Sequence, residues 1–327
     1  MSTREKYLNF VCFYLIKYDI VTNGHFISAK QGVYMNRLEK HPMLGIVIGV
    51  IGISLSSIFV KFSNAPSSVT AVYRILWTVL LMTPMVFGKK DIRKELFSVD
   101  KKTAFLSALS GLFLAVHFVL WFESLQLTSV ASSTTIVCTE VIWVSLGFCL
   151  FLKGKLSWKA ILAILITIIG SILIALSDSA SGGTHLSGDI LALLAAIASA
   201  AYTLIGRNVR SHVSTSVYTY IVYFVCTIVL LLTCFAQGYN IFDYDISAVI
   251  VGLLLAVFST ILGHSIFSWC LKFFSPSFVS ASKLCEPVVA AIIAAFLFDE
   301  IPALIQIIGS VIILCGVYYY SKLERSK

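Results

Sequence analysis

The chain has 327 residues, of which 58% are hydrophobic and only 12% are charged, and its mean hydropathy is +0.94. Because a water-soluble domain carries roughly 25% charged residues, this composition excludes a water-soluble protein. The formal net charge of +8 would suggest a nucleic-acid partner in a soluble protein. Here the positions of the charges matter more than their sum, because nearly the whole chain is apolar.

Ten apolar stretches have the length of a membrane-spanning helix, about 20 residues. They fall at about 43–63, 66–87, 103–123, 128–152, 156–176, 187–207, 214–236, 246–271, 276–298 and 302–321. Their apolar runs are unbroken rather than alternating, and an open sheet leaves backbone groups unsatisfied in lipid, so helices are favoured over strands. The sequence therefore predicts an all-α integral membrane protein with ten transmembrane helices.

Basic residues gather at alternate connections between these stretches, a pattern that marks the cytoplasmic side. They are Lys89, Lys90, Arg93, Lys94, Lys101, Lys102, Lys153, Lys155, Lys159, Arg207, Arg210, Lys272 and, at the C-terminus, Lys322, Arg325 and Lys327. The other connections hold acids instead, namely Asp178, Asp243, Asp245, Asp299 and Glu300, and Lys61 is the only basic residue near any of them. Both termini, including the tail 322–327, are therefore expected in the cytoplasm, and an even number of spans likewise requires them to share one side.

Residues 1–42 contain the apolar run Leu8–Ile16, which Asn9 interrupts and which is too short to span a membrane. No small-residue cleavage site follows it, so a signal peptide is not expected. We interpret the segment as a cytoplasmic arm. The alternative is that translation begins at Met35, which would leave only a short basic lead.

The chain repeats itself after a shift of 146 positions, which places Glu140 on Glu286 and Gly170 on Gly316 without a gap. The two halves, about 43–176 and 187–321, would each contain five spans. An odd number of spans forces the second copy to enter the membrane in the opposite sense, so the repeat is expected to be inverted. Two inverted halves can expose one central site to each side in turn, which favours transport.

Four ionisable residues lie deep within the expected helices, where charged groups are costly and usually functional. They are Arg74, Glu140, Lys283 and Glu286. Lys283 and Glu286 are three residues apart and are therefore expected on one helical face. We hypothesise that Glu286 binds a coupling proton. The alternative is a static ion-pair network that holds the helices together.

His117 and His264 fall one position away from equivalence in the third and eighth spans. Imidazole can relay protons or bind substrate, although an isolated histidine in a bundle also serves as an interhelical hydrogen-bonding group. Trp143 shares a helical face with Glu140 and is a candidate pocket residue. Other rings that either line a pocket or pack between helices are Trp77, Tyr73, Tyr202, Tyr220 and Tyr223. Pro287 is expected to bend or open the ninth helix beside Glu286.

No signature of an enzyme, a bound cofactor or a metal site stands out in the sequence. The eight cysteines include no C-x-x-C pair, and no phosphate-binding loop, H-E-x-x-H or nucleophile-elbow motif occurs. We therefore expect a protein that is not an enzyme and that holds no cofactor, metal or nucleic acid.

The last sixty or so residues resemble the end of an EamA domain of the drug/metabolite transporter superfamily. The matching stretches are Glu286–Ala290, Asp299–Pro302, Gln306–Gly309 and Cys315–Val317. Arg74 is also similar to an arginine often found in the second helix of that family. The resemblance covers about residues 43–321 as two tandem units and implies a ten-helix inverted-repeat carrier, usually an exporter of metabolites or drugs.

Together these features predict a secondary carrier for a small metabolite, amino acid-like or drug-like, that works by alternating access. The expected site comprises Arg74, Glu140, Trp143, Lys283 and Glu286, with His117 and His264, and its partners are the substrate, protons and the lipid bilayer. A channel or a non-transporting membrane subunit is the competing interpretation, and a lipid-modifying enzyme ranks last. A bacterial inner membrane is favoured over an organellar one, and a monomer is the working expectation.

Overall fold

The computed structural model describes residues 41–60, 62–128, 133, 136–178, 186–298 and 303–325. The chain divides into two units, Met1–Gly45 and Ile46–Lys327, and everything below concerns the second unit apart from the first residues of α3. Most of the expected cytoplasmic arm, with the candidate start Met35, lies outside the described residues. So do Asp299 and Glu300.

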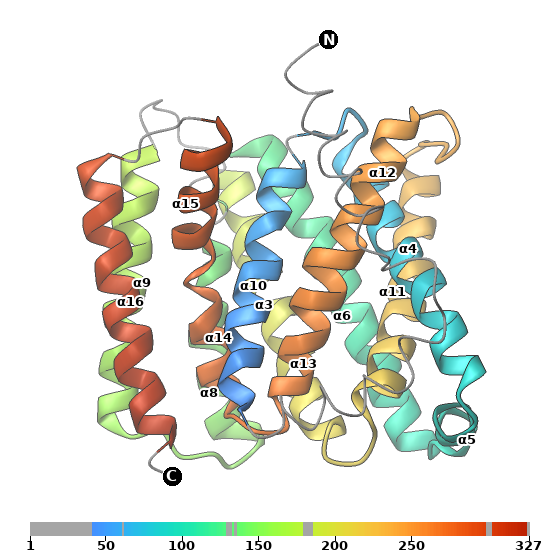
Figure 1. Ribbon diagram of the computed structural model, residues 1–327, viewed down its shortest axis with the longest axis horizontal. Coiled ribbons are helices and arrows are strands. Elements are labelled where there is room, and N and C mark those ends of the chain that lie inside the picture. The colour runs from blue at the N-terminus through green and yellow to red at the C-terminus, as the bar shows by residue number, and fades with distance from the viewer. Residues whose placement is uncertain are drawn as a thin grey trace. The chain divides into compact units, whose positions relative to one another are not determined.

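Every regular element in the described part of the chain is a helix, in accord with the predicted fold class. The elements are α3 (Pro42–Val60), α4 (Ser67–Gly88), α5 (Lys90–Ser98), α6 (Lys101–Leu127), α8 (Glu140–Phe151), α9 (Trp158–Asp178), α10 (Leu186–Val209), α11 (Thr215–Ala236), α12 (Ile246–Leu254), the π-helix η1 (Leu255–Ser265), α13 (Ile266–Cys270), α14 (Pro276–Lys283), α15 (Glu286–Phe298) and α16 (Leu304–Arg325). Figure 1 shows them with the same labels.

Eight helical stretches of the described chain are long and apolar enough to cross a membrane. Two further apolar helices lie at the fourth and fifth expected spans, over Ile136–Phe151 and Trp158–Leu173 of the described residues. The second of these continues as α9 to Asp178. Eight of the ten expected spans are thus found at full length in the described part of the chain, and the total of ten stays a prediction.

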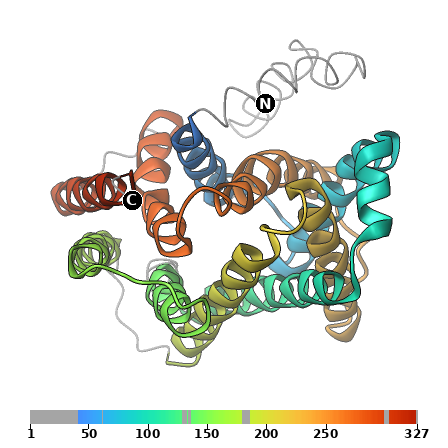
Figure 2. The ribbon, with the colours of Figure 1, turned by 90° about the horizontal axis from the view of Figure 1, so that it is seen from below.

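The fifth helices of the two repeats, α9 and α16, pack against each other (Figures 1 and 2). A Cβ atom placed on Gly170 would lie 2.7 Å from the carbonyl oxygen of Gly309, and one on Gly316 would lie 2.6 Å from Cγ2 of Thr167. Gly170 and Gly316 are equivalent positions of the two repeats. Gly170 faces Gly309 and Ile313 of α16, and Gly316 faces the equivalent residues Ala163 and Thr167 of α9. The pair therefore has the local two-fold symmetry that the sequence repeat predicts.

The first helix of each repeat packs against the third helix of the other. α10 lies along α6, and α3 approaches η1 so closely that a Cβ on Gly52 would lie 2.7 Å from the carbonyl oxygen of Phe258. In Figure 1, α4 descends toward α5 at the lower edge, whereas its counterpart α11 rises from that edge. The two repeats are thus interlocked rather than set side by side.

The two glutamates that occupy equivalent positions of the repeats each begin a helix. A turn at Thr139 precedes α8, which starts at Glu140, and a turn at Leu284 and Cys285 separates α14 from α15, which starts at Glu286. Pro287 lacks an N–H group and cannot continue the hydrogen-bonding pattern of α14. The expected opening of the ninth helix beside Glu286 is therefore present.

Candidate functional site

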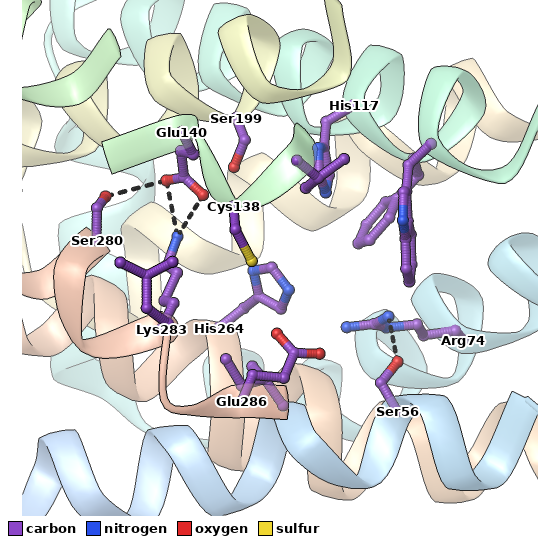
Figure 3. A pocket seen from close by; sticks show the side chains of 15 residues that line it. Ser56, Arg74, His117, Cys138, Glu140, Ser199, His264, Ser280, Lys283 and Glu286 are labelled. Carbon is purple, nitrogen blue, oxygen red and sulfur yellow. Dashed lines mark hydrogen bonds and ion pairs between the residues drawn. The ribbon is translucent and has the colours of Figure 1, made fainter. Parts of the chain in front are cut away.

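A central cavity of about 90 Å³ lies between the two repeats and is drawn in Figure 3. Its volume corresponds to roughly six to nine water-sized groups, at ~10–15 Å³ for each. The lining residues come from both repeats and are Ile53, Ser56, Arg74, His117, Phe118, Trp121, Val137, Cys138, Glu140, Ser199, His264, Ser280, Lys283, Leu284 and Glu286. Six of the seven residues expected from the sequence therefore meet at one cavity.

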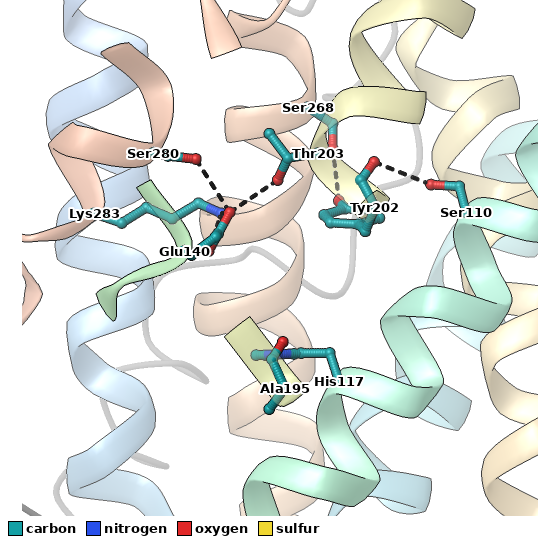
Figure 4. A network of polar contacts seen from close by, with 9 residues as sticks. All are labelled: Ser110, His117, Glu140, Ala195, Tyr202, Thr203, Ser268, Ser280 and Lys283. Carbon is teal, nitrogen blue, oxygen red and sulfur yellow. Dashed lines mark hydrogen bonds and ion pairs between the residues drawn. The ribbon is translucent and has the colours of Figure 1, made fainter. Parts of the chain in front are cut away.

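Glu140 is the centre of a polar network at one end of the cavity (Figure 4). Lys283 donates from Nζ to both of its carboxylate oxygens, at 2.9 and 3.2 Å. The hydroxyls of Thr203 and Ser280 donate to Oε1 at 3.0 and 3.1 Å. Because Glu140 belongs to the first repeat and Lys283 to the second, this ion pair joins the two halves directly.

Arg74 is buried on α4, with 2% of its surface exposed, and its described hydrogen-bond partners are neutral. Its Nε donates to Thr260 on η1 at 2.8 Å, and Nη1 donates to Ser56 at 3.4 Å. The guanidinium carbon lies 4.8 Å from the centre of the Phe118 ring, within cation–π range. Of the five guanidinium N–H groups, these two bonds leave three, enough for a carboxylate.

Glu286 opens α15, and its carboxylate accepts no hydrogen bond from another residue in the described ranges. Its side chain and that of Arg74 extend toward the same part of the cavity (Figure 3). Its backbone carbonyl, in contrast, is held by Ser54, whose Oγ donates at 3.2 Å. The helix start is thus fixed while the carboxylate remains available to a ligand.

Lys283 and Glu286 do not lie on one continuous helix, as their spacing predicted. α14 ends at Lys283, and a turn at Leu284 and Cys285 separates it from α15, which starts at Glu286. Lys283 instead pairs with Glu140, its only ion pair within the described residues.

His117 and His264 both line the cavity but differ in their partners. Nδ1 of His117 lies 3.0 Å from the carbonyl oxygen of Ala195, and the ring stacks on Trp121 at 6.2 Å and 8°. His117 therefore serves as the interhelical link that the sequence left open as one alternative. His264, near the end of η1, makes ring contacts with Phe118 and Tyr202. Extended π-helical stretches are rare and frequently occur at functional sites.

Trp143 does not line the cavity, although the sequence placed it on one face with Glu140. Only the first residue of α8 reaches the cavity, and Trp143 lies almost one turn further along the helix. Its indole N–H is buried without a partner among the described residues. The other candidate rings also lie elsewhere: Tyr202 and Tyr223 bond Ser268 and Ser265 at 2.8 and 2.9 Å.

Sequence reasoning did not identify Phe118 and the cavity serines Ser56, Ser199 and Ser280. Serines are common in membrane helices as packing residues, so nothing in the sequence singles these out. Ser280 carried one usable signal, because it precedes Lys283 by three residues on α14 and therefore shares its face.

The described residues include no group of three or more His, Cys, Asp or Glu side chains placed to hold a metal ion. The seven cysteines within that part of the chain are free thiols.

The sequence profile of the EamA-like transporter family matches residues 40–176 and again residues 186–322. The chain belongs to this family. The two matches are offset by 146 positions, the shift that superposes Glu140 on Glu286, so each repeat is one EamA unit. This family member is accordingly a multi-pass membrane protein of the transporter class.

Three relatives carry the name of uncharacterised transporters. YxxF of Bacillus subtilis (strain 168) is 25% identical over 89% of this chain and 90% of its own length. A protein of Clostridium kluyveri is 24% identical over 81% of this chain and 87% of its own, and one of Archaeoglobus fulgidus is 23% identical over 76% and 85%.

A solved crystal structure shares the fold. It superposes with a TM-score of 0.71 at 13% identity and covers 86% of this chain and 97% of the other. At this identity the likeness concerns the fold alone.

Proposed function

We propose that this EamA protein is a secondary carrier that moves a small zwitterionic metabolite, such as an amino acid, by alternating access between its two repeats. The observation that carries the proposal is a difference among the four ionisable residues of the cavity. Lys283 and Glu140 form an ion pair at 2.9 Å, whereas Arg74 and Glu286 face the same cavity and form no direct ion pair among the described residues. One cation and one anion are thus left for a ligand.

A zwitterion matches this arrangement in sign and in size. Its carboxylate would take the remaining N–H groups of Arg74 in a bidentate manner, and its ammonium would bind Glu286. A cavity of about 90 Å³ suits a molecule of small-amino-acid size.

Proton coupling follows from the same site. When no ammonium is bound, the Glu286 carboxylate in the cavity is the group best placed to take a proton in its stead, and exchange of proton for substrate would link the two fluxes. We assign the coupling role to Glu286 and a supporting role to Glu140. Cytoplasmic termini belong to this proposal and rest on the distribution of basic residues. Export from the cell is proposed from the family resemblance, and a bacterial inner membrane from the short connections between the spans.

The test is uptake of labelled amino acids and other metabolites by proteoliposomes, with and without an imposed pH gradient. A carrier of zwitterions shows saturable uptake of at least one amino acid, and the gradient accelerates it. Saturable uptake confined to apolar cations would reject the substrate class. Flux that rises linearly with concentration, or no flux from folded protein, would favour the channel or subunit interpretation.

A further inference from the structure

The short helix α5 lies across the ends of two long helices. It joins α4 to α6, and Figure 1 shows it end-on while α4 and α6 run along the page. In the perpendicular view of Figure 2, α5 is seen along its length. None of its residues is buried. A helix that runs across the end of a membrane bundle lies in the plane where lipid head groups are found.

Basic side chains are concentrated on this helix and at the start of the next one. Lys90, Arg93 and Lys94 on α5 and Lys101 and Lys102 on α6 are all exposed. Apolar rings lie among them, with Phe97 75% and Phe105 66% exposed. Cations together with outward aromatic rings form the surface that anionic membranes attract.

Two of the three acids in this stretch are occupied by backbone N–H groups. The Glu95 carboxylate accepts from the backbone N–H of Ser214 at 2.6 Å, beside the start of α11. Asp100 caps α6 by accepting from the N–H groups of Lys102 and Thr103, each at 3.0 Å. Hydrogen bonds from the side chain and backbone of Thr103 hold the pKa of Asp100 below its ordinary value. The three acids remain charged, but the six basic residues between positions 89 and 102 outnumber them and leave the stretch with a net charge of +3.

α5 is also held at a fixed depth against the bundle. Nη1 of Arg93 donates to the carbonyl oxygen of Phe87 at 3.3 Å, and the rings of Phe87 and Phe97 meet edge-to-face at 6.3 Å. Together with the contact between Glu95 and Ser214, these interactions fix the basic surface relative to α4 and α11.

We propose that α5 and the first turn of α6 form a binding site for the head group of an anionic phospholipid, with Lys90, Lys94, Lys101 and Lys102 on the phosphate and Phe97 among the acyl chains. The continuity of this surface with the exposed apolar face of α4, which includes Leu80 and Leu81, favours a lipid over a soluble anion. This site is separate from the central cavity and does not depend on what the cavity transports.

The experiment measures lipid binding to the full chain in mild detergent by native mass spectrometry. Phosphatidylglycerol and phosphatidylcholine with identical acyl chains are compared. The variant Lys90→Gln/Lys94→Gln/Lys101→Gln removes three charges of the site. The matched control, Lys153→Gln/Lys155→Gln/Lys159→Gln, removes three exposed lysines from another connection on the same expected side.

We expect the unaltered protein to prefer phosphatidylglycerol and the α5 variant to lose at least about tenfold of that preference, since each basic group near an anionic surface contributes measurably to binding. The control retains the preference. Equal binding of the two lipids by the unaltered protein would overturn the proposal, and so would an equal loss in the control. Displacement of phosphatidylglycerol by millimolar inorganic phosphate would instead indicate a site for soluble anions and would also overturn it.

Discussion

Glu140 and Glu286 occupy the same position of the two repeats, yet their surroundings give them different tasks. Glu140 receives four hydrogen bonds from Lys283, Thr203 and Ser280, whereas Glu286 faces the cavity across from Arg74. The difference arises at one pair of equivalent positions, where the second repeat has Lys283 and the first has Val137. The presence of Lys283 in only one repeat thus gives Glu140 a structural role and leaves Glu286 as the proposed ligand-binding group.

The ion pair between Glu140 and Lys283 is expected to stabilise the contact between the repeats. Each single variant, Lys283→Met or Glu140→Gln, removes one partner of the pair and leaves the other group largely shielded from water without its partner. This should lower the free energy of unfolding by about 3–5 kcal/mol. The double variant should lose clearly less than the sum of the two. Thermal unfolding in detergent, analysed as a double-mutant cycle, measures this coupling; strictly additive losses would show that the pair contributes nothing.

Glu286→Gln should act on transport and not on stability. The carboxylate has no ion pair to lose among the described residues, so the melting temperature should stay near that of the unaltered protein. The acceleration of uptake by a pH gradient should disappear, because the side-chain amide of glutamine does not gain or lose a proton in this pH range. Gradient-dependent uptake that persists in this variant would assign coupling to another group. Glu140→Gln serves as the matched comparison, with the opposite expectation for stability.

At the scale of helices, the sequence predicted some breaks and missed others for identifiable reasons. Pro287 predicted the break in the helix before α15, because proline cannot donate a backbone hydrogen bond. The equivalent turn before α8 has Val141 in place of proline and gave no signal. The π-helix η1 was also unforeseen, since its residues differ little in hydropathy from an ordinary span. The partner of Lys283 is Glu140 of the other repeat, a contact that spacing along the chain does not show.

The close contact of α9 with α16 depends on the absence of side chains at Gly170 and Gly316. Gly170→Ala would place a methyl group 2.7 Å from the Gly309 carbonyl oxygen, and such overpacking typically costs about 1–3 kcal/mol. The melting temperature should fall accordingly. The matched control is Gly88→Ala near the end of α4, where an added Cβ meets nothing within 4 Å. An unchanged melting temperature for Gly170→Ala would show that the two helices can separate freely.

At the scale of the whole molecule, the sequence predicted the helical class, the duplication and the family, because hydropathy and the 146-residue shift depend on many positions at once. It did not show the turn at Thr139 before α8, since the apolar run continues through that position without interruption. The cavity itself required the three-dimensional arrangement, because its residues come from helices that the chain order separates.

The basic connections predict where the ends of the chain lie. A fluorescent protein fused after Lys327 should fold and fluoresce in bacterial cells, as it does in the cytoplasm, whereas alkaline phosphatase at the same position should remain inactive. The opposite pair of readouts would place the C-terminus outside and would contradict the orientation derived from the lysine and arginine distribution.

The central claim is that one site is exposed alternately to the two sides, and solute counterflow tests it most directly. Proteoliposomes are preloaded with an unlabelled substrate amino acid, diluted, and given a trace of the labelled form. A carrier exchanges the two and accumulates label transiently above equilibrium, and the account predicts this overshoot together with its loss in Arg74→Ala. Label that only equilibrates, at a rate independent of the preloaded solute, would contradict alternating access.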